Sequence, residues 1–414
     1  MPETAETSMS DRAGFILVIL LLICDYGRPQ DAIGAIGAIR PSLILTVLLF
    51  IAWLRARGPA RGNRLPPQLW LMLLLLGLLL IHVPFATNHY LAYMTAQDFL
   101  LLLPFCLGVV WFVNTPERLA TYMRWWVFLA TFIALKAILH PAGSVGSSFL
   151  GDPNDVSLLL DAMVPFVVYL FMSEGRRAFK LVYLGIIVLC VAGIVSTASR
   201  GGFVGLLAVS VVLWWISPRK VLVLSLLLVT GLITYTLVDE SYIDRISSIQ
   251  ATDEGTAKGR LDSWKAAWNM FEEHPLGVGP GNFPIRFPEY QGQAFGHHNM
   301  WGRAAHSLWF TLLAELGIPG AILYWLLLRA DWRSLRRMYI AQPADPRRRD
   351  KFLLAVAFTA SLVGFFAAGT FVSVLFYPHF WLLSAMIVAA ERILCTGLAG
   401  AGSELTATSH AHVG

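Results

Sequence analysis

Three residues of this chain have side chains that can bind an anion or accept a proton. They are Arg200 in STASRGGF, Arg260 in KGRLDSW and His306 in RAAHSLW. A guanidinium group is planar and permanently charged, so it can hold a phosphate or another anion through paired hydrogen bonds. A neutral imidazole, which titrates at about pH 6.5, can take the proton of a hydroxyl group within hydrogen-bond reach. These residue types therefore suit the binding of an anion and the removal of a proton.

Each of the three also has a purely structural interpretation. Arg200 lies between two apolar segments, where it either binds an anionic group at a membrane surface or reaches lipid phosphate. Gly201 and Gly202, which follow it, allow close approach of a backbone or ligand. Arg260 begins a helix, where a cation is disfavoured, although a solvated loop arginine is the simpler interpretation. His306 is either a base or a solvated helix cap.

Other polar residues are weaker candidates. The positions that resemble Arg260 in context are Lys258, Lys265, Arg286 and Arg303. His297 and His298 compete with His306 as a base, and with His274 they suggest a metal cluster. No carboxylate or third histidine follows at the spacing of a zinc protease, so we predict no metal.

Three further motifs have a local explanation or stay open. Asp152 and Asn154, in SSFLGDPNDVSL, are typical of a turn and a helix cap. HPLGVGPGNF (274–283) is glycine-rich, but without a strand–turn–helix context it predicts a tight turn and no nucleotide loop. Asp161 and Glu315 lie within apolar segments and are therefore functional candidates. A regular helix would turn Glu315 away from His306, so we do not pair them.

The composition indicates an integral membrane protein. Of the 414 residues, 57% are hydrophobic and 14% are charged, and the mean hydropathy is +0.63. Soluble domains are about half apolar and about a quarter charged. The four cysteines are far apart and form no CxxC or Cys/His cluster, so we predict neither a disulfide framework nor a cysteine metal site.

About twelve apolar segments can cross a bilayer, which takes roughly 20 residues each, fewer with amphipathic flanks. This predicts an all-α polytopic membrane protein. The segments are 13–24, 41–54, 68–86, 98–113, 119–139, 156–172, 180–196, 202–216, 220–238, 307–328, 352–374 and 378–394.

The distribution of Lys and Arg predicts a cytoplasmic N-terminus, because cytoplasmic connections are rich in these residues. The connections at 55–64 and 329–351 are strongly basic, whereas those at 87–97 and 140–155, on the opposite side, contain no Lys or Arg. The net charge of +5 follows from this alternation, and no basic groove with interleaved aromatic residues indicates nucleic acid.

The connection 239–306 is large enough to be a small domain on the non-cytoplasmic side. Helical spacing predicts one amphipathic helix at 242–249 and a second that ends at His274-Pro275, carrying Leu261, Trp264, Trp268 and Phe271 on one face. We expect both along the membrane surface or over a cavity mouth. The chain then divides into spans (1–238), the large loop (239–306), further spans (307–394) and a disordered cytoplasmic tail (395–414).

The order of these motifs resembles that of the O-antigen ligase and O-antigen polymerase superfamily. SFLGDPNDV precedes a span, STASRGGF lies between two spans, GRLDSWKAAWNMFEEHPLGVGPGNF lies in the large loop and AAHSLWFTLLAELG enters a late span. The similarity is close from about 147 to 320, and over the first 140 residues it is one of topology.

The resemblance implies a GT-C-like glycosyltransferase of the bacterial cytoplasmic membrane with its active site on the periplasmic side. Such enzymes move a glycan from a polyprenyl (undecaprenyl) diphosphate carrier to an acceptor hydroxyl, with inversion and without a metal or other cofactor. The family's two arginines, one of them in a G-R-x-x-x-W context, fall on Arg200 and Arg260, and its histidine falls on His306. These would bind the diphosphate and accept the proton. The secondary candidates for the site are Lys258, Arg303, Asn154 and His298.

Several functions stay open. The acceptor can be a lipid A core sugar (ligase), the next repeat unit (polymerase) or a protein hydroxyl (protein O-oligosaccharyltransferase). A transporter or flippase would instead be expected to have charges in mid-span and paired broken helices. A non-catalytic assembly subunit would keep its activity without Arg200 and His306.

Overall fold

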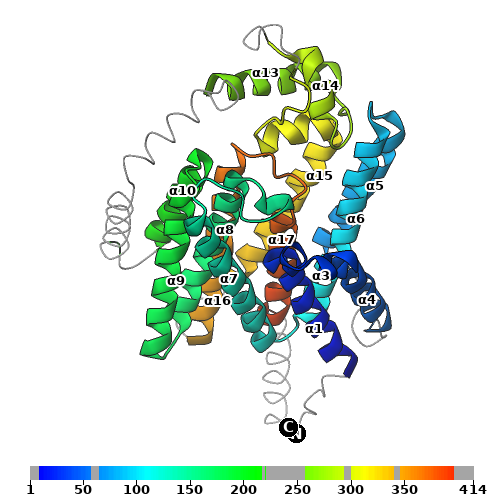
Figure 1. Ribbon diagram of the computed structural model, residues 1–414. Coiled ribbons are helices and arrows are strands. Elements are labelled where there is room, and N and C mark those ends of the chain that lie inside the picture. Colours follow the sequence, from blue (N-terminus) through cyan, green and yellow to red (C-terminus); the bar gives the residue numbers. More distant parts are fainter. Residues whose placement is uncertain are drawn as a thin grey trace, which may run out of the picture.

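The computed structural model describes residues 9–56, 65–216, 220, 257–292, 300–339 and 346–395. Over these residues the chain forms helices and connecting turns, without a β-strand. Figure 1 shows long helices that run side by side, with two shorter helices at the upper end. The protein is an all-α polytopic membrane protein, which confirms the predicted fold class.

Eight helices of the described part are long and apolar enough to cross a membrane. They are α5 (Pro67–His82, extended by the turn Val83–Phe85), α6 (His89–Phe112), α7 (Pro116–Leu139), α8 (Pro153–Ser173), α9 (Arg177–Ser196), α15 (Leu308–Tyr339), α16 (Pro346–Gly369) and α17 (Pro378–Cys395). Three shorter helices match other predicted segments: α1 (Met9–Leu22), α4 (Pro41–Ala56) and α10 (Arg200–Ile216). The predicted segment 220–238 lies outside the described residues, apart from its first residue.

Some predicted boundaries differ from the observed ones. Helix α6 begins at His89, although the apolar segment was expected from residue 98, and α15 continues to Tyr339 beyond the expected end at residue 328. Polar residues extend both helices past the apolar window. Helix α16 ends at Gly369, so residues 370–377 form a loop where a span to residue 374 was expected. Glycine has low helix propensity, and proline at residue 378 begins the next helix.

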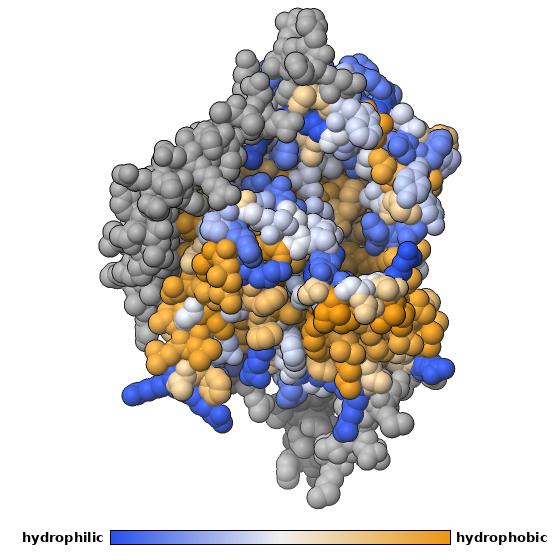
Figure 2. Space-filling model, in the orientation of Figure 1, coloured by the Kyte–Doolittle hydropathy of each residue, from blue (hydrophilic) through white to orange (hydrophobic). Residues whose placement is uncertain are grey.

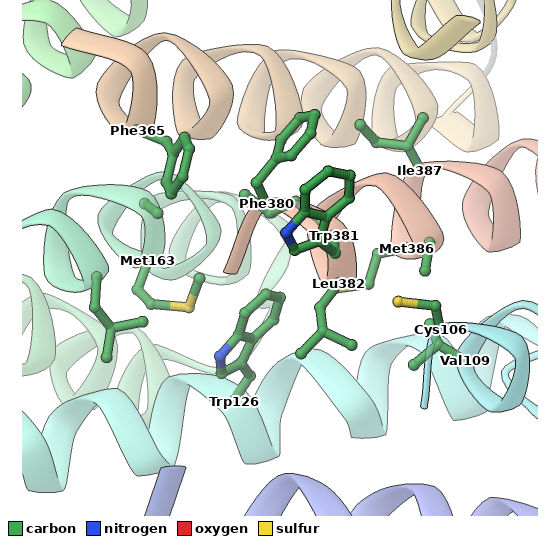
Figure 3. Close-up of a cluster of buried hydrophobic side chains, with 14 of the residues drawn as sticks. Cys106, Val109, Trp126, Met163, Phe365, Phe380, Trp381, Leu382, Met386 and Ile387 are labelled. Carbon is green, nitrogen blue, oxygen red and sulfur yellow. The ribbon is translucent and has the colours of Figure 1, made fainter. Parts of the chain in front are cut away.

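The bundle is built around α17. Every residue from His379 to Ala390 is buried, as expected for a helix that is apolar on most sides. Figure 3 shows Phe380 and Trp381 of this helix within a cluster drawn from several neighbours. The ring of Trp381 meets that of Phe99 in α6 edge-on at 4.8 Å and that of Tyr324 in α15 at 5.9 Å. Helix α17 is therefore an interior helix that supports α6 and α15.

Glycines bring α10 close to α8 and α16. A Cβ atom on Gly202 would lie 2.5 Å from the Cβ of Ser157 in α8, and one on Gly205 would meet Asp161 in α8 and, at 3.0 Å, Ala368 in α16. Small residues at membrane-helix interfaces permit this approach of two backbones. The start of α10 is consequently held beside the start of α8.

The cap consists of α13 (Ala257–Glu273), α14 (Phe283–Tyr290), the loop 274–282 and residues 300–307, and it lies over the start of α15 (Figure 1). It has a small apolar core made by Ala266, Ala267, Met270, Val278, Phe283, Phe287, Ala305 and Ala314. The predicted helix that ends before His274 is confirmed as α13. The side of α13 that packs into the core of the cap carries Ala266, Ala267 and Met270. On the face that was predicted to be packed, Leu261 and Trp268 are 53% and 46% exposed. The predicted helix at 242–249 lies outside the described residues.

Connections that were predicted to share one side of the membrane contact one another. The backbone N–H of Ala142 donates to the carbonyl of Ser196 at 2.9 Å, and that of Asn88 donates to Asn282 Oδ1 at 2.7 Å. Figure 2 shows an apolar belt around the lower part of the molecule and a hollow between this belt and the polar upper end. The observed contacts agree with the alternation of connections predicted from the charges.

Candidate active site

Arg200 is the first residue of α10 and is exposed. A polar link to α8 holds it there, because Ser199 Oγ donates to Asn154 Oδ1 at 2.7 Å and accepts from the N–H of Gly202 at 3.0 Å. Asp152 caps α8 as the sequence predicted, accepting from the N–H of Asn154 at 2.7 Å. The side chain of Asn154 thus joins two helix starts and positions Arg200.

Arg260 lies in the first turns of α13 and is half-buried. Burial is the first cause that lowers the pKa of Arg260, the positive charges of Arg200 and Arg303 lower it further, and Asp152 opposes them. An arginine still stays protonated at neutral pH because its pKa is so high. Charged groups from three separate segments, Arg200, Arg303 and Asp152, therefore act on Arg260. Such a cluster is suited to an anion.

Arg303 is a buried residue of the cap, in the segment that leads into α15. It is 7% exposed, and its Nε donates to Ser263 Oγ of α13 at 2.9 Å. Ser263 in turn donates to the carbonyl of Gly259 at 2.9 Å. Arg303 therefore fastens the residues before α15 to the same turn of α13 that carries Arg260.

His306 lies in the short segment between Arg303 and α15, and it is half-buried. The helix cap is the next residue: Ser307 Oγ accepts from the N–H of Phe310 at 3.5 Å, and its carbonyl accepts from the N–H of Thr311 at 3.0 Å. The backbone of His306 has a φ of 48°, a left-handed conformation that is uncommon for residues other than glycine. Conformations of this kind cluster at functional sites. Ser307, and not His306, is therefore the helix-capping residue of α15.

Trp264 connects the segments that carry these residues. Its ring stacks on Phe310 of α15 at 5.3 Å and lies 6.1 Å from Phe371 in the loop 370–377. A Cβ atom on Gly201 would lie 3.3 Å from the Cβ of Phe371, so the same loop reaches the start of α10. Trp264 and Phe371 therefore bring the surroundings of Arg200, Arg260 and His306 together.

The loop 370–377 forms the base of this arrangement, and sequence reasoning missed it by assigning most of it to a span. Ser373 Oγ accepts from Thr311 Oγ1 at 3.2 Å, and the hydroxyl of Tyr377 donates to the buried Asp155 of α8 at 2.9 Å. The signal that was available is the pair formed by the glycine at 369 and the proline at 378, which bracket the segment.

The remaining predicted residues lie elsewhere or outside the described part. Glu315 accepts hydrogen bonds from the N–H groups of Gly281 and Phe283, at 2.9 and 3.2 Å. Asp161 is fully buried in α8, and neither carboxyl oxygen has a hydrogen-bond partner. Lys258 belongs to the first turn of α13, but its side chain is outside the described part, as are His297 and His298.

Within the part of the chain that the structure describes, no group of three or more His, Cys, Asp or Glu side chains could hold a metal ion. Because His297 and His298 fall outside that part, metal independence remains a prediction.

Residues 185–325 match the family described as O-Antigen ligase. No curated protein matches the chain. The matched region runs from α9 through α10 and the cap into α15, and it contains Arg200, Arg260, Arg303 and His306. Residues 185–325 are therefore similar to that family, which supports the resemblance carried by the order of the motifs.

Proposed function

We propose that this protein transfers a glycan from a polyprenyl diphosphate carrier to an acceptor hydroxyl, at the periplasmic face of a bacterial cytoplasmic membrane. The observation that supports this most directly is that the positive charges of Arg200 and Arg303 act on Arg260, while Arg303, which is bonded to α13, lies three residues before His306 in the chain. These residues lie where membrane helices meet the cap, which is the level at which the headgroup of a lipid-linked donor lies. The family match supports the same class of reaction.

In the proposed reaction, the acceptor oxygen forms a bond to the anomeric carbon as the bond from that carbon to the diphosphate oxygen breaks. The bonding electrons leave with the lipid diphosphate, whose negative charge grows in the transition state. Arg200 and Arg260 bind the phosphate oxygens and stabilise this charge, because donors already in place need no reorganisation as the charge develops. Attack from the side opposite the leaving group inverts the anomeric centre.

His306 takes the proton that the acceptor hydroxyl loses as it attacks. The half-buried position leaves the imidazole access to a substrate, and a base is effective when it lies within hydrogen-bond reach of the proton. The strained backbone at this residue orients the ring independently of the helix that follows. No step of this mechanism requires a metal or another cofactor.

A transporter is the alternative with some structural support, because α15 is broken at Gly317 and α8 contains the buried Asp161. In transporters, a broken helix leaves backbone groups free to bind the substrate or an ion. Here protein backbone occupies the break, since the carbonyl of Pro275 accepts from the N–H of Ile318 at 2.9 Å. The break therefore fastens the cap, and the transferase proposal accounts for more of the observations.

The test is a reconstituted assay with a polyprenyl diphosphate-linked glycan and a panel of acceptors: lipid A core, a protein substrate and a second lipid-linked glycan. The acceptor that is glycosylated distinguishes ligase, protein transferase and polymerase. We expect His306→Ala to abolish transfer while donor binding persists, because the arginines remain. His140→Ala, which removes an exposed histidine at the end of α7, is the matched control and should transfer normally. Transfer by His306→Ala at the wild-type rate would exclude the proposed base.

A further inference from the structure

We propose that Glu315 is a positioning residue that fixes Arg260 and His306 relative to each other through the glycine-rich loop 274–283. This inference rests on the proposed function for its catalytic consequence, whereas the contact itself is independent of it. Glu315 is 3% exposed and lies in the first part of α15, before the break at Gly317.

The contact is a pairing of backbone and side chain between the loop and α15. The two carboxylate oxygens of Glu315 accept from the N–H groups of Gly281 and Phe283, at 2.9 and 3.2 Å. Its carbonyl accepts from the N–H of Gly279 at 2.9 Å, and that of Ala314 accepts from the N–H of Val278 at 2.9 Å. A carboxylate that binds two backbone N–H groups makes stronger hydrogen bonds than a neutral acceptor does.

Glycines make this pairing sterically possible. Gly277, Gly279, Gly281 and Gly317 all have positive φ, between 60° and 100°. A Cβ atom on Gly277 would collide with the carbonyl oxygen of Glu315, and one on Gly317 would collide with the carbonyl oxygen of Pro275. The break in α15 at Gly317 and the turns of the loop are therefore two sides of one interface, which we call the clasp (residues 275–283 with 314–318).

The clasp is also fastened to the turn between α5 and α6. His82 Nε2 lies 2.8 Å from the carbonyl oxygen of Leu276, and the N–H of Asn88 donates to Asn282 Oδ1 at 2.7 Å. The loop is thus held from two membrane helices at once. The bundle therefore sets the position of this part of the cap.

The clasp lies between the two functional elements in the chain. It follows α13, which carries Arg260, and Glu315 belongs to the same straight part of α15 that begins just after His306. Ala266 and Met270 of α13 pack in one core with Ala305 and Ala314. A loosened clasp would let α13 shift on α15, which changes the distance between the bound diphosphate and the base.

The first experiment measures kcat and KM for the donor in Glu315→Gln. The amide retains one accepting oxygen but places an NH2 group against a backbone N–H, so one of the two bonds is lost without a change in size. A displacement of about 1 Å in a catalytic group lowers the rate by about 10²-fold, so we expect kcat to fall by roughly that factor while KM changes little. Glu315→Asp, which keeps the charge, should recover part of the loss.

Gly277→Ala disturbs the same contact from the loop side and should give the same change in kcat. Because both substitutions act on one contact, the double variant should lose less than the product of the two single losses. Gly292→Ala is the control, since a Cβ atom there meets nothing within 4 Å. Fully multiplicative losses would show that the two residues act separately.

A second readout does not depend on activity. Spin labels are attached at Leu261→Cys on α13 and Leu139→Cys at the end of α7, which are both exposed positions. Double electron–electron resonance then measures the distance between the labels, which reports the position of the cap on the bundle. The half-buried Cys395 is replaced by serine, and the other cysteines are buried. We expect a narrow distance distribution in the parent and a broadened or shifted one in Glu315→Gln.

The outcomes separate the two proposals. A parental distance distribution in Glu315→Gln would overturn the positioning role, whether or not transfer occurs. A broadened distribution together with unchanged kcat would also overturn it, because the cap would then move without consequence. A broadened distribution in a protein whose wild type transfers no glycan would refute the proposed function and leave the clasp as a structural contact.

Discussion

Arg260 is the residue on which the charges of the site act together. Arg200 and Arg303 both disfavour its charged form, and Asp152 only opposes them in part. Like charges held near one another in a half-buried place are tolerated when an anion can join them. A diphosphate would relieve this repulsion, so the arrangement favours substrate binding as much as transition-state stabilisation.

At this scale, the first prediction concerns the shape of the cation. Arg200→Lys keeps the charge but replaces a planar fork by a single ammonium group, which cannot bind two phosphate oxygens in parallel. We expect kcat/KM to fall by about 10²-fold or more, the effect of losing one donor to a transition-state charge. Arg286→Lys is the control, because Arg286 pairs with Glu289 on the cap at 2.6 Å. Equal activity of Arg200→Lys and wild type would exclude a paired phosphate contact.

A second prediction at this scale is that chelation leaves activity intact. The proposed chemistry uses a good leaving group, fixed positive charges and one base, and therefore has no step that a divalent cation must assist. Transfer should proceed at the same rate in buffer with EDTA as in buffer with added Mg²⁺. Inhibition by EDTA that Mg²⁺ or Zn²⁺ reverses would restore the metal interpretation of His297 and His298.

The interface between α8 and α10 determines how precisely Arg200 is placed. The polar link from Asn154 to Ser199 acts only because the glycines of α10 let the two helix starts approach. Close packing of α10 on α8 therefore makes this interface rigid, and the bond from Ser199 to Asn154 fixes how the two helix starts are aligned.

This interface predicts a difference between two glycine substitutions. Gly202→Ala places a methyl group 2.5 Å from the Cβ of Ser157, and overpacking of this kind costs about 1–3 kcal/mol. Gly185→Ala, in the middle of α9, meets nothing within 4 Å and should gain up to about 1 kcal/mol in helix propensity. Thermal unfolding in detergent should show a lower Tm for the first variant and an equal or higher Tm for the second. A Tm for Gly202→Ala at or above the parent's would mean that the helices separate easily.

The two ends of the molecule differ, because one carries the basic connections and the other carries the cap. On the predicted cytoplasmic side, Arg337 pairs with Glu391 at 2.5 Å, and Lys351 Nζ donates to the carbonyl of Leu394 at 2.5 Å. On the other side, α8, α10, α13 and the loop 370–377 meet around the site. The distribution of Lys and Arg predicts that the capped end lies outside the cytoplasm.

Cysteine labelling in intact cells tests this orientation. In a background where Cys395 is replaced by serine, Tyr90→Cys at the start of α6 should react with a membrane-impermeant maleimide. Arg336→Cys, an exposed position near the end of α15, should react only after the cells are permeabilised. The reverse pattern would place the site in the cytoplasm and contradict the proposed donor, which is presented at the outer face.

Sequence patterns alone predict the helical class, the order and approximate bounds of the described spans, the helix that ends before His274, and the helix-capping role of Asp152. Each of these follows from apolar periodicity or from a capping residue next to the element it ends, which are local interactions. The sequence also singled out Arg200 and His306, because a charged or titratable group beside an apolar segment is unusual wherever the chain goes afterwards. Arg260 was singled out through the resemblance to the O-antigen ligase superfamily.

Which of these residues lie close together depends on tertiary packing. Arg303 is only a secondary candidate from the sequence, yet its bond to Ser263 fastens it to the turn of Arg260. The loop 370–377 became the base of the site through contacts with α8, α13 and α15. Glu315, which the sequence marks only as a charge within an apolar segment, binds two backbone N–H groups at the centre of the clasp. Packing between segments more than 30 residues apart in sequence sets these relations, and no local propensity encodes them.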